Sequence, residues 1–342
     1  MLFVIFCLII SDLIEQFFQE ISAMNIGSNI LITGGLGFIG SYFAEKISLE
    51  KRVIILDNFS ANSKEAYESL NGRKNITIFD EDILFCDYAN YLPNINTVFH
   101  FAANSDISSG VDNPQVDFEI TTKGTHRLLT SMQKYNVKNI IYPSGSGVYG
   151  DVKETILSEK YGPLEPVSFY GASKLSAESY ISSFCHMTDI EAKVFRFANV
   201  VGFRQTHGVA YDLIKKLRND PSFLEVKGNG FQSKSYIHVD DIFNGIMTVL
   251  GNKNDTRKYE VFNLATDDYI TVKEIVSAIL NSLELSETTK VNYGNTSGGW
   301  LGDVPVVRFD TSKIRKLGWK NQYNSKEAMS LAIDYLIKHD FS

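Results

Sequence analysis

Short apolar segments alternate with longer amphipathic ones from residue 29 to about residue 200 of the chain. The apolar segments are rich in branched aliphatic and aromatic residues, which is typical of strands buried on both faces of a parallel sheet. They cover residues 29–33, 53–56, 76–79, 97–101, 139–142 and 192–197. Because parallel strands connected by helices follow right-handed crossovers, this order predicts a doubly wound α/β fold.

Beyond about residue 200 the regular alternation weakens, and helices are expected near residues 209–217, 239–250 and 272–283. We therefore expect residues 24–198 to form a Rossmann-type domain. Residues 199–342 should form mainly a smaller C-terminal α/β lobe that binds the substrate, with a segment at about 235–265 returning to the first domain. Residues 1–23 are expected to be a dispensable extension or a mis-assigned start, with a peripheral membrane anchor as the alternative.

The composition of the 342-residue chain narrows the function classes. Its formal net charge of −7 and the lack of a polybasic run argue against a nucleic-acid partner or a membrane surface. Three cysteines, none of them in a CxxC pair, fit a reducing cytoplasm and favour neither a disulfide framework nor a metal site.

A glycine-rich turn follows the first predicted strand, with Gly34, Gly37 and Gly40 at the spacing of a dinucleotide-binding loop. Such a loop lets the backbone approach a pyrophosphate, which then lies at a helix N-terminus. Asp57 ends the second strand, where a carboxylate accepts hydrogen bonds from the adenosine ribose and repels a 2′-phosphate. The predicted cofactor is therefore NAD rather than NADP. Further contacts are expected from Phe38, Ile39, Asn58, Asp82, Ile83, Phe101, Ala102 and Ala103, whereas His100 is expected to be a packed core residue.

Tyr170 and Lys174 are four residues apart on a predicted helix and therefore share one face. A free phenol, with a pKa of about 10, is a poor base at neutral pH. A nearby ammonium group favours the phenolate and lowers that pKa. The pair therefore predicts a proton relay for the interconversion of an alcohol and a ketone, with NAD accepting the hydride.

These motifs together resemble the extended short-chain dehydrogenase/reductases that act on nucleotide sugars, over residues 29–319. The resemblance is carried by residues 33–40, Asp57-Asn58, 100–103, 148–150, 170–174, 196–202, 228–230 and 236–241. Residues 207–212 and 299–304 look most like archaeal-type UDP-glucose 4-epimerases. The resemblance implies transient oxidation of a UDP-sugar at C4 to a 4-keto sugar and its re-reduction, with NAD retained. It also implies a homodimer built from the stretch after Pro114 and the helix that carries Tyr170.

Three positions depart from the family pattern: Gly145, Trp300 and Thr121, which replaces an asparagine common before the Gly124-Thr125 pair. Gly145 stands where the family carries a catalytic Ser or Thr, so Ser144 is our candidate for that role. Ser146 is the alternative hydroxyl and a candidate substrate contact, and both serines could instead serve only the loop backbone. The same loop lacks the acids of the 4,6-dehydratase branch, which argues against a dehydratase. Trp300 replaces the diphosphate-binding arginine of many epimerases, so we expect the substrate to contact Asn199, Arg204, His207, Lys234, Trp300 and Asp303.

Two other functions remain open. One is another NAD-dependent nucleotide-sugar reaction, such as a dehydration or the epimerisation of an N-acetylated or uronic sugar. The other is a catalytically weak NAD-binding module, which Gly145 would favour and the Tyr170/Lys174 pair disfavours.

Overall fold

The computed structural model describes residues 26–61, 64–104, 109–252 and 257–339. The extension expected over residues 1–23 lies outside them. Among the described helices, none is both long and apolar enough to cross a lipid bilayer.

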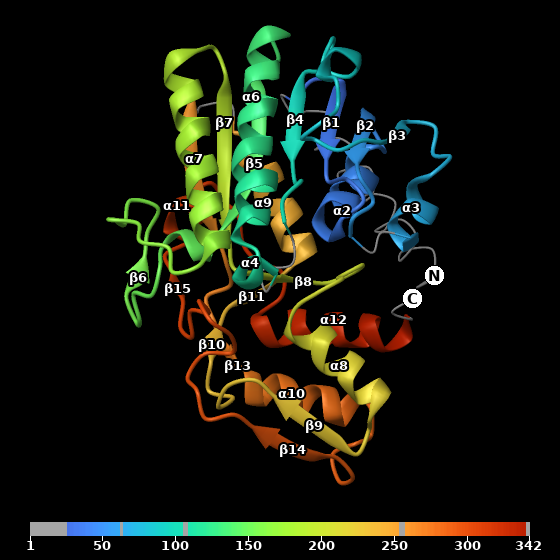
Figure 1. Ribbon diagram of the computed structural model, residues 1–342, viewed down its shortest axis with the longest axis vertical. Coiled ribbons are helices and arrows are strands. Elements are labelled where there is room, and N and C mark those ends of the chain that lie inside the picture. Colours follow the sequence, from blue (N-terminus) through green and yellow to red (C-terminus); the bar gives the residue numbers. More distant parts are fainter. Residues whose placement is uncertain (1–25, 62–63, 105–108, 253–256, 340–342) are drawn as a thin grey trace, which may run out of the picture.

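A seven-stranded sheet, parallel throughout, forms the upper part of the molecule in Figure 1 and confirms the predicted fold class. The six predicted strands all lie in it, each within a few residues of its expected bounds. In spatial order the strands are β12 (Tyr259–Leu264), β7 (Glu191–Phe197), β5 (Asn139–Gly145), β4 (Thr97–His100), β1 (Asn29–Thr33), β2 (Arg52–Asp57) and β3 (Ile76–Asp80).

Helices cover both faces of this sheet, as buried parallel strands require. One face packs on α2 (Phe38–Ile47), α3 (Lys64–Leu70) and α9 (Val239–Gly251). The opposite face packs on α6 (Gly124–Lys134) and α7 (Phe169–Met187), which lie side by side in Figure 1. The long helix expected over residues 115–135 is interrupted: α5 (Pro114–Asp117) leads through the π-helical turn η2 (Phe118–Lys123) into α6.

The lower part of the molecule in Figure 1 has an apolar core of its own. Three helices enclose that core: α8 (Val209–Asn219), α10 (Val272–Ser282) and α12 (Ser325–Lys338). Short strands complete this lobe and its junction with the sheet domain. They are β6 (Ile156–Leu157), β8 (Asn199–Val201), β9 (Phe223–Val226), β10 (Ser233–Lys234), β11 (Tyr236–His238), β13 (Ile270–Thr271), β14 (Lys290–Tyr293) and β15 (Arg308–Phe309).

The chain returns to the large sheet after it has built α8 and α9, because β12 pairs in parallel with β7. The edge strand β12 is thus formed by residues that lie far beyond the predicted domain boundary near residue 198. That boundary stays a prediction.

Candidate active site

The turn between β1 and α2 and the start of α2 are packed so closely that Gly34 and Gly40 have no room for a side chain. Gly34 has a φ of +66°, and a Cβ atom there would lie 2.6 Å from the backbone nitrogen of Ala102. A Cβ on Gly40 would lie 2.1 Å from the carbonyl oxygen of Gly34. These two positions need glycine for reasons of space and conformation. The result is a bare backbone surface before the first turn of α2, which is the kind of surface that a pyrophosphate needs.

Asp57 lies at the C-terminal end of β2, beside this turn. Its carboxylate accepts hydrogen bonds from the backbone N–H groups of Leu36 (2.9 Å) and Phe59 (2.9 Å). Burial raises the pKa of Asp57, and the two backbone hydrogen bonds oppose that shift. The carboxylate is therefore fixed next to the glycine turn, with acceptor capacity left for the hydroxyls of a ribose. The residues present fit NAD.

The other expected cofactor residues end neighbouring strands at the same edge. Asp82 accepts a hydrogen bond from the side-chain amide of Asn58 (2.9 Å), so the loops after β2 and β3 are linked. Ile83 is buried, and Phe101, Ala102 and Ala103 follow β4 with partial exposure. The parallel strands thus bring these residues to one edge of the sheet, next to the glycine turn.

His100 is fully buried and confirms the expectation of a core residue. Its ring nitrogens are within hydrogen-bond distance of the hydroxyls of Thr33 (2.6 Å) and Thr125 (3.0 Å). Burial, and to a lesser extent the charge of Lys174, lowers the pKa of His100 to about 3.

Tyr170 and Lys174 lie on one face of α7, whose N-terminus is capped by Ser168 accepting a hydrogen bond from the N–H of Gly171 (3.0 Å). The Lys174 Nζ atom is 5.8 Å from the centre of the Tyr170 ring. It donates a hydrogen bond to the carbonyl oxygen of Pro143 (2.9 Å) at the end of β5. Lys174 is buried, whereas Tyr170 is partly exposed, so the phenol is the more accessible member of the pair.

The pKa shifts of the pair differ from the simple expectation that the ammonium group lowers the phenol's pKa. Burial, followed by the negative charge of Asp117, raises the pKa of Tyr170 to about 12. Burial lowers the pKa of Lys174 to about 8, against the opposing charges of Glu178 and Asp117. The protein alone therefore holds the proton on Tyr170, and removing it requires additional positive charge in the site.

The loop that follows β5 lies directly on the first turn of α7. A Cβ on Gly145 would have no atom within 4 Å, so this position faces open space. Ser144 points the other way and is 4% exposed. Within the described residues its hydroxyl has no hydrogen-bond partner. Ser146 is partly exposed at the start of the 3₁₀ turn η3 (Ser146–Val148).

Three of the expected substrate residues meet in the C-terminal lobe. Lys234 on β10 forms an ion pair with Asp303 (2.5 Å), which also accepts a hydrogen bond from the N–H of Gly299 (2.8 Å). Trp300 lies in the turn that this carboxylate closes, and a Cβ on Gly302 in the same turn would come within 3.0 Å of the carbonyl oxygen of Val167. The turn therefore reaches from the lobe to the residues just before α7.

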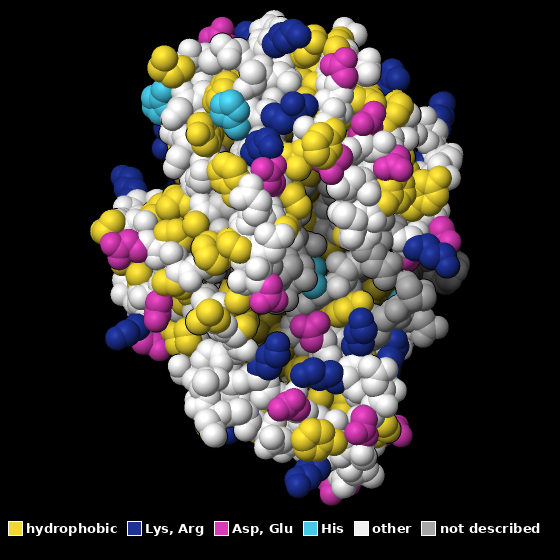
Figure 2. Space-filling model, viewed as in Figure 1, with side chains coloured by type: hydrophobic (Ala, Val, Ile, Leu, Met, Phe, Trp, Pro, Cys, Tyr) yellow, Lys and Arg dark blue, Asp and Glu magenta, His cyan; other side chains and the backbone are white. Residues whose placement is uncertain are grey.

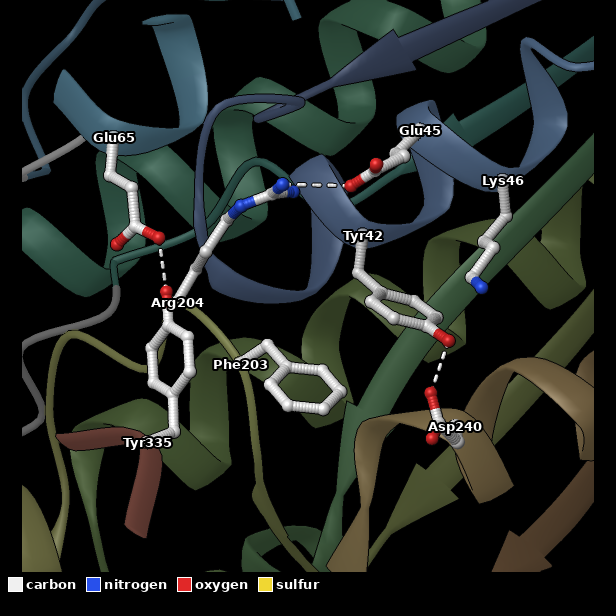
Figure 3. A pocket seen from close by; sticks show the side chains of 8 residues that line it. All are labelled: Tyr42, Glu45, Lys46, Glu65, Phe203, Arg204, Asp240 and Tyr335. Carbon is white, nitrogen blue, oxygen red and sulfur yellow. Dashed lines mark hydrogen bonds and ion pairs between the residues drawn. The ribbon is translucent and has the colours of Figure 1, made fainter. Parts of the chain in front are cut away.

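Arg204 does not join that group. Its guanidinium forms an ion pair with Glu45 of α2 (2.7 Å), as Figure 3 shows. The two residues line a polar cavity together with Tyr42, Lys46, Glu65, Phe203, Asp240 and Tyr335. Two further hydrogen bonds cross this cavity, from Tyr42 to Asp240 and from Tyr335 to Glu65. Arg204 thus ties the sheet domain to the segment before α8.

The remaining two substrate candidates lie apart from each other. Asn199 begins β8 and is partly exposed, and its side chain is hydrogen-bonded to the phenol of Tyr236. His207 is exposed in the loop before α8, next to Thr206. Whether either contacts a nucleotide stays a prediction.

The structure adds three residues that local sequence patterns did not single out. Asp117 is buried at the end of α5, and its charge acts on both Tyr170 and Lys174. Glu178 and Arg196 form a buried ion pair behind Lys174. The only sequence signal for Glu178 is its spacing, four residues after Lys174 on the same helix face.

Charged side chains of both signs are interspersed on the face shown in Figure 2. Among the residues placed by the structure, no group of three or more His, Cys, Asp or Glu side chains could hold a metal ion.

Comparisons with known proteins agree with this geometry. Residues 30–265 match the model of the NAD dependent epimerase/dehydratase family. A Methanocaldococcus jannaschii protein that is provisionally named a UDP-glucose 4-epimerase is 30% identical over 313 residues, covering 90% of this chain and 98% of its own. A UDP-glucose 4-epimerase of Mycolicibacterium smegmatis is 25% identical over 313 residues, covering 89% and 97%.

Solved structures give the same result. A UDP-galactose 4-epimerase superposes with a TM-score of 0.80 at 29% identity, covering 91% of this chain and 99% of its own. A Thermotoga maritima UDP-glucose 4-epimerase with UDP-glucose gives a TM-score of 0.79 at 29% identity and the same coverage. The chain belongs to the NAD-dependent epimerase/dehydratase family of nucleotide-sugar enzymes, and its cofactor is NAD.

Proposed function

We propose that this protein is a nucleotide-sugar 4-epimerase, with UDP-glucose and UDP-galactose as its substrate pair. The observation that carries the proposal is the Tyr170–Lys174 pair on one face of α7, in a chain whose glycine turn fits NAD. The similarity to 4-epimerases over about nine-tenths of the chain supports the choice of reaction. The resulting enzyme class is an isomerase of the UDP-glucose 4-epimerase type.

In this proposal NAD, when bound, supplies the hydride acceptor for oxidation at the sugar C4 atom. The glycine turn would hold its pyrophosphate, and Asp57 would hold its adenosine ribose. Tyr170 takes the proton of the C4 hydroxyl and later returns it, so the protein holds that proton between the two half-reactions. Because the pKa of Tyr170 is raised to about 12, the phenol retains the proton well. Release of the proton from the free phenol would then depend on positive charge beyond that of the protein, which the oxidised cofactor would supply.

Ser144 is our candidate for the hydroxyl that shares the substrate proton with Tyr170. Its support is a buried hydroxyl that lacks a partner within the described residues, at the end of β5. The proposal must also account for Gly145, where the family pattern has a serine or threonine. A side chain at that position would point into open space. Ser146, the more exposed of the two serines, remains the alternative.

We further propose that Lys234, Asp303, Trp300 and Asn199 contact the nucleotide half of the substrate. Lys234 is then the cation for the diphosphate, and the Asp303 carboxylate that now pairs with it would exchange that contact on binding. Arg204 is the weaker candidate for this role, because Glu45 already neutralises its charge.

We also propose that the protein forms a homodimer and that it acts in the cytoplasm. The dimer would form through α7 and the stretch after Pro114, where Phe118, Tyr180 and Met187 expose apolar surface (52%, 42% and 83%). Light scattering at micromolar concentration tests it: the mass of a monomer would contradict a dimer.

The deciding experiment incubates the purified protein with UDP-galactose and, separately, with UDP-N-acetylgalactosamine, without added NAD. NMR and mass spectrometry follow the products. Conversion to the gluco isomer at unchanged mass supports a 4-epimerase that retains its cofactor. Loss of one water would instead identify a dehydratase. No conversion of either substrate, even with NAD supplied, would contradict the proposed substrate pair.

A further inference from the structure

A buried ion pair lies directly behind the catalytic lysine. Arg196, on β7, donates to both carboxylate oxygens of Glu178, on α7, at 3.1 and 2.7 Å. The two side chains are only 4% and 3% exposed. Glu178 follows Lys174 by four residues, one helical turn further along the same face. The pair therefore fixes the helix that carries Tyr170 and Lys174 to the C-terminal end of β7.

Arg196 also connects this helix to the loop after β5. Its guanidinium carbon is 4.7 Å from the centre of the Tyr149 ring, a distance at which the cation is attracted to the ring face. Tyr149 in turn donates a hydrogen bond to the side chain of Asn263 on β12 (2.7 Å). One guanidinium thus contacts the catalytic helix on one side and, on the other, the turn that ends the Ser144–Gly147 loop.

The register of the sheet places Ser144 beside Arg196 on the neighbouring strand. Residues paired across parallel strands point to the same face, so both side chains point toward α7. In the part of the chain that the structure describes, the Ser144 hydroxyl and the Nη1 atom of Arg196 are both buried without a hydrogen-bond partner. Buried polar groups are normally hydrogen-bonded, so these two atoms are exceptions, and they lie on neighbouring strands on the face that α7 covers.

Stability alone gives a weak reason for such a pair. The desolvation of two charges often exceeds their attraction, and apolar side chains of similar size commonly replace a buried ion pair without loss of stability. The pair has a second effect, because its carboxylate lies near Lys174. Burial disfavours the charged form of Lys174, and Glu178 is the foremost charge that opposes this by raising the pKa of the lysine.

We propose that Glu178 and Arg196 are positioning residues for the proton relay: Glu178 keeps Lys174 charged and in place beside Tyr170, and Arg196 holds Glu178 and the loop of Ser144 in register. The inference rests on the proposed role of Tyr170 and Lys174. Glu178 and Arg196 need not touch substrate or cofactor. They act by determining the charge of Lys174.

The test separates this role from a structural one by replacing the whole pair. In the double variant E178L/R196M no buried charge is left unpaired, so its melting temperature should match or exceed that of the wild type. R196M alone leaves the Glu178 carboxylate buried without its partner and should lower the melting temperature. E178Q removes the carboxylate charge at nearly constant shape. E260Q is the matched control, because Glu260 is a buried, ion-paired glutamate on β12 that does not appear among the charges acting on Lys174.

Two measurements report the charge state of the Lys174 amine. The first is the pH midpoint for labelling of its amine by an acylating reagent in the cofactor-free protein, measured by mass spectrometry. The second is the alkaline limb of the pH profile of kcat/KM. In E178L/R196M and in E178Q both should move to lower pH by about one unit, because the opposite charge that favours the ammonium is gone. E260Q should keep the wild-type values.

A double variant with the labelling midpoint and pH profile of the wild type would overturn the proposal, because the pair would then have no effect on the charge of Lys174. If the double variant does not fold, E178Q decides by the same criterion. The labelling midpoint needs no substrate. A wild-type protein that turns over no nucleotide sugar would therefore contradict the proposed function, while the midpoint still tests the effect of Glu178.

Discussion

Gly147 and Gly171 lie against each other backbone to backbone, where the loop after β5 crosses the first turn of α7. A Cβ on Gly171 would lie 2.5 Å from the carbonyl oxygen of Gly147, and a Cβ on Gly147 would lie 3.3 Å from the Cα of Gly171. Gly171 therefore has no room for a side chain, and Gly147 is tightly packed against it. Two positions before Gly147, at Gly145, there is no such restriction.

This difference predicts opposite results for two glycine substitutions. G145S places a hydroxyl in open space at the position where the family pattern has one, so it should fold normally. Because Ser144 is proposed to supply that hydroxyl already, turnover should change by less than about twofold. G171A should lower the free energy of unfolding by about 1–3 kcal/mol, because its methyl group overlaps the loop backbone. Urea denaturation and initial rates with UDP-galactose check both. A G145S protein with a turnover about tenfold or more above that of the wild type would contradict the role proposed for Ser144.

Replacing Tyr170 by Phe removes the proton carrier and little else. We expect turnover to fall by about 10²–10⁴-fold, the usual contribution of general acid–base catalysis, while NAD stays bound. The measurement pairs the initial rate with the cofactor content of the purified protein. A Y170F variant with near-wild-type rate would contradict the role of Tyr170, and one without NAD would show that the phenol serves cofactor binding.

Lys234 and Arg204 should respond differently when each is changed to Met. K234M removes the cation proposed for the diphosphate, and we expect the Kd for UDP to rise by about tenfold, as for the loss of one charge-assisted hydrogen bond. R204M breaks the ion pair with Glu45 and should lower the melting temperature with little effect on that Kd. Calorimetric titration with UDP gives both values. Equal losses of affinity would return Arg204 to the substrate site.

His100 makes stability depend on pH in the acid range. Its pKa is about 3 in the folded protein, whereas a histidine in the unfolded chain titrates near about 6.5. Between these values the unfolded state binds more protons, so stability is complete above about pH 6.5 and falls as the pH drops toward 3. H100N should reduce this slope by about one proton, and H126N, at an exposed histidine, should not. Urea midpoints measured across this pH range provide the check.

Sequence patterns identified six strands of the large sheet and missed the seventh, β12. The runs at β1 and β2 are buried on both faces, so nearly every residue in them is hydrophobic. The edge strand β12 alternates partly buried and buried positions, and it carries Glu260 and Asn263. Its segment was expected to return to the sheet domain, but nothing local marks it as a strand, because its polar residues are satisfied by contacts with distant elements.

The features of the candidate site also divide into those that a local sequence pattern marks and those that depend on distant contacts. Glycine spacing and the Tyr170–Lys174 interval are local, and the sequence contains them directly. The influence of Asp117 on Tyr170 depends on how α5 packs against α7, and the partner of Arg204 depends on how the segment before α8 meets α2. Neither arrangement can be predicted from the pattern of the residues between these segments. Arg204, which we expected to contact the substrate, is instead paired with the carboxylate of Glu45.

The late return of β12 to the sheet also sets an order of events during synthesis. Until residue 264 has left the ribosome, β7 is an open strand edge that carries Arg196, because its neighbour on that side is made only after α8 and α9. Unpaired edges attract other chains and favour aggregation. A nascent chain of this protein therefore passes through a long interval in which its catalytic helix rests on an unfinished sheet, and fragments that end before Tyr259 should be recovered mainly as aggregates.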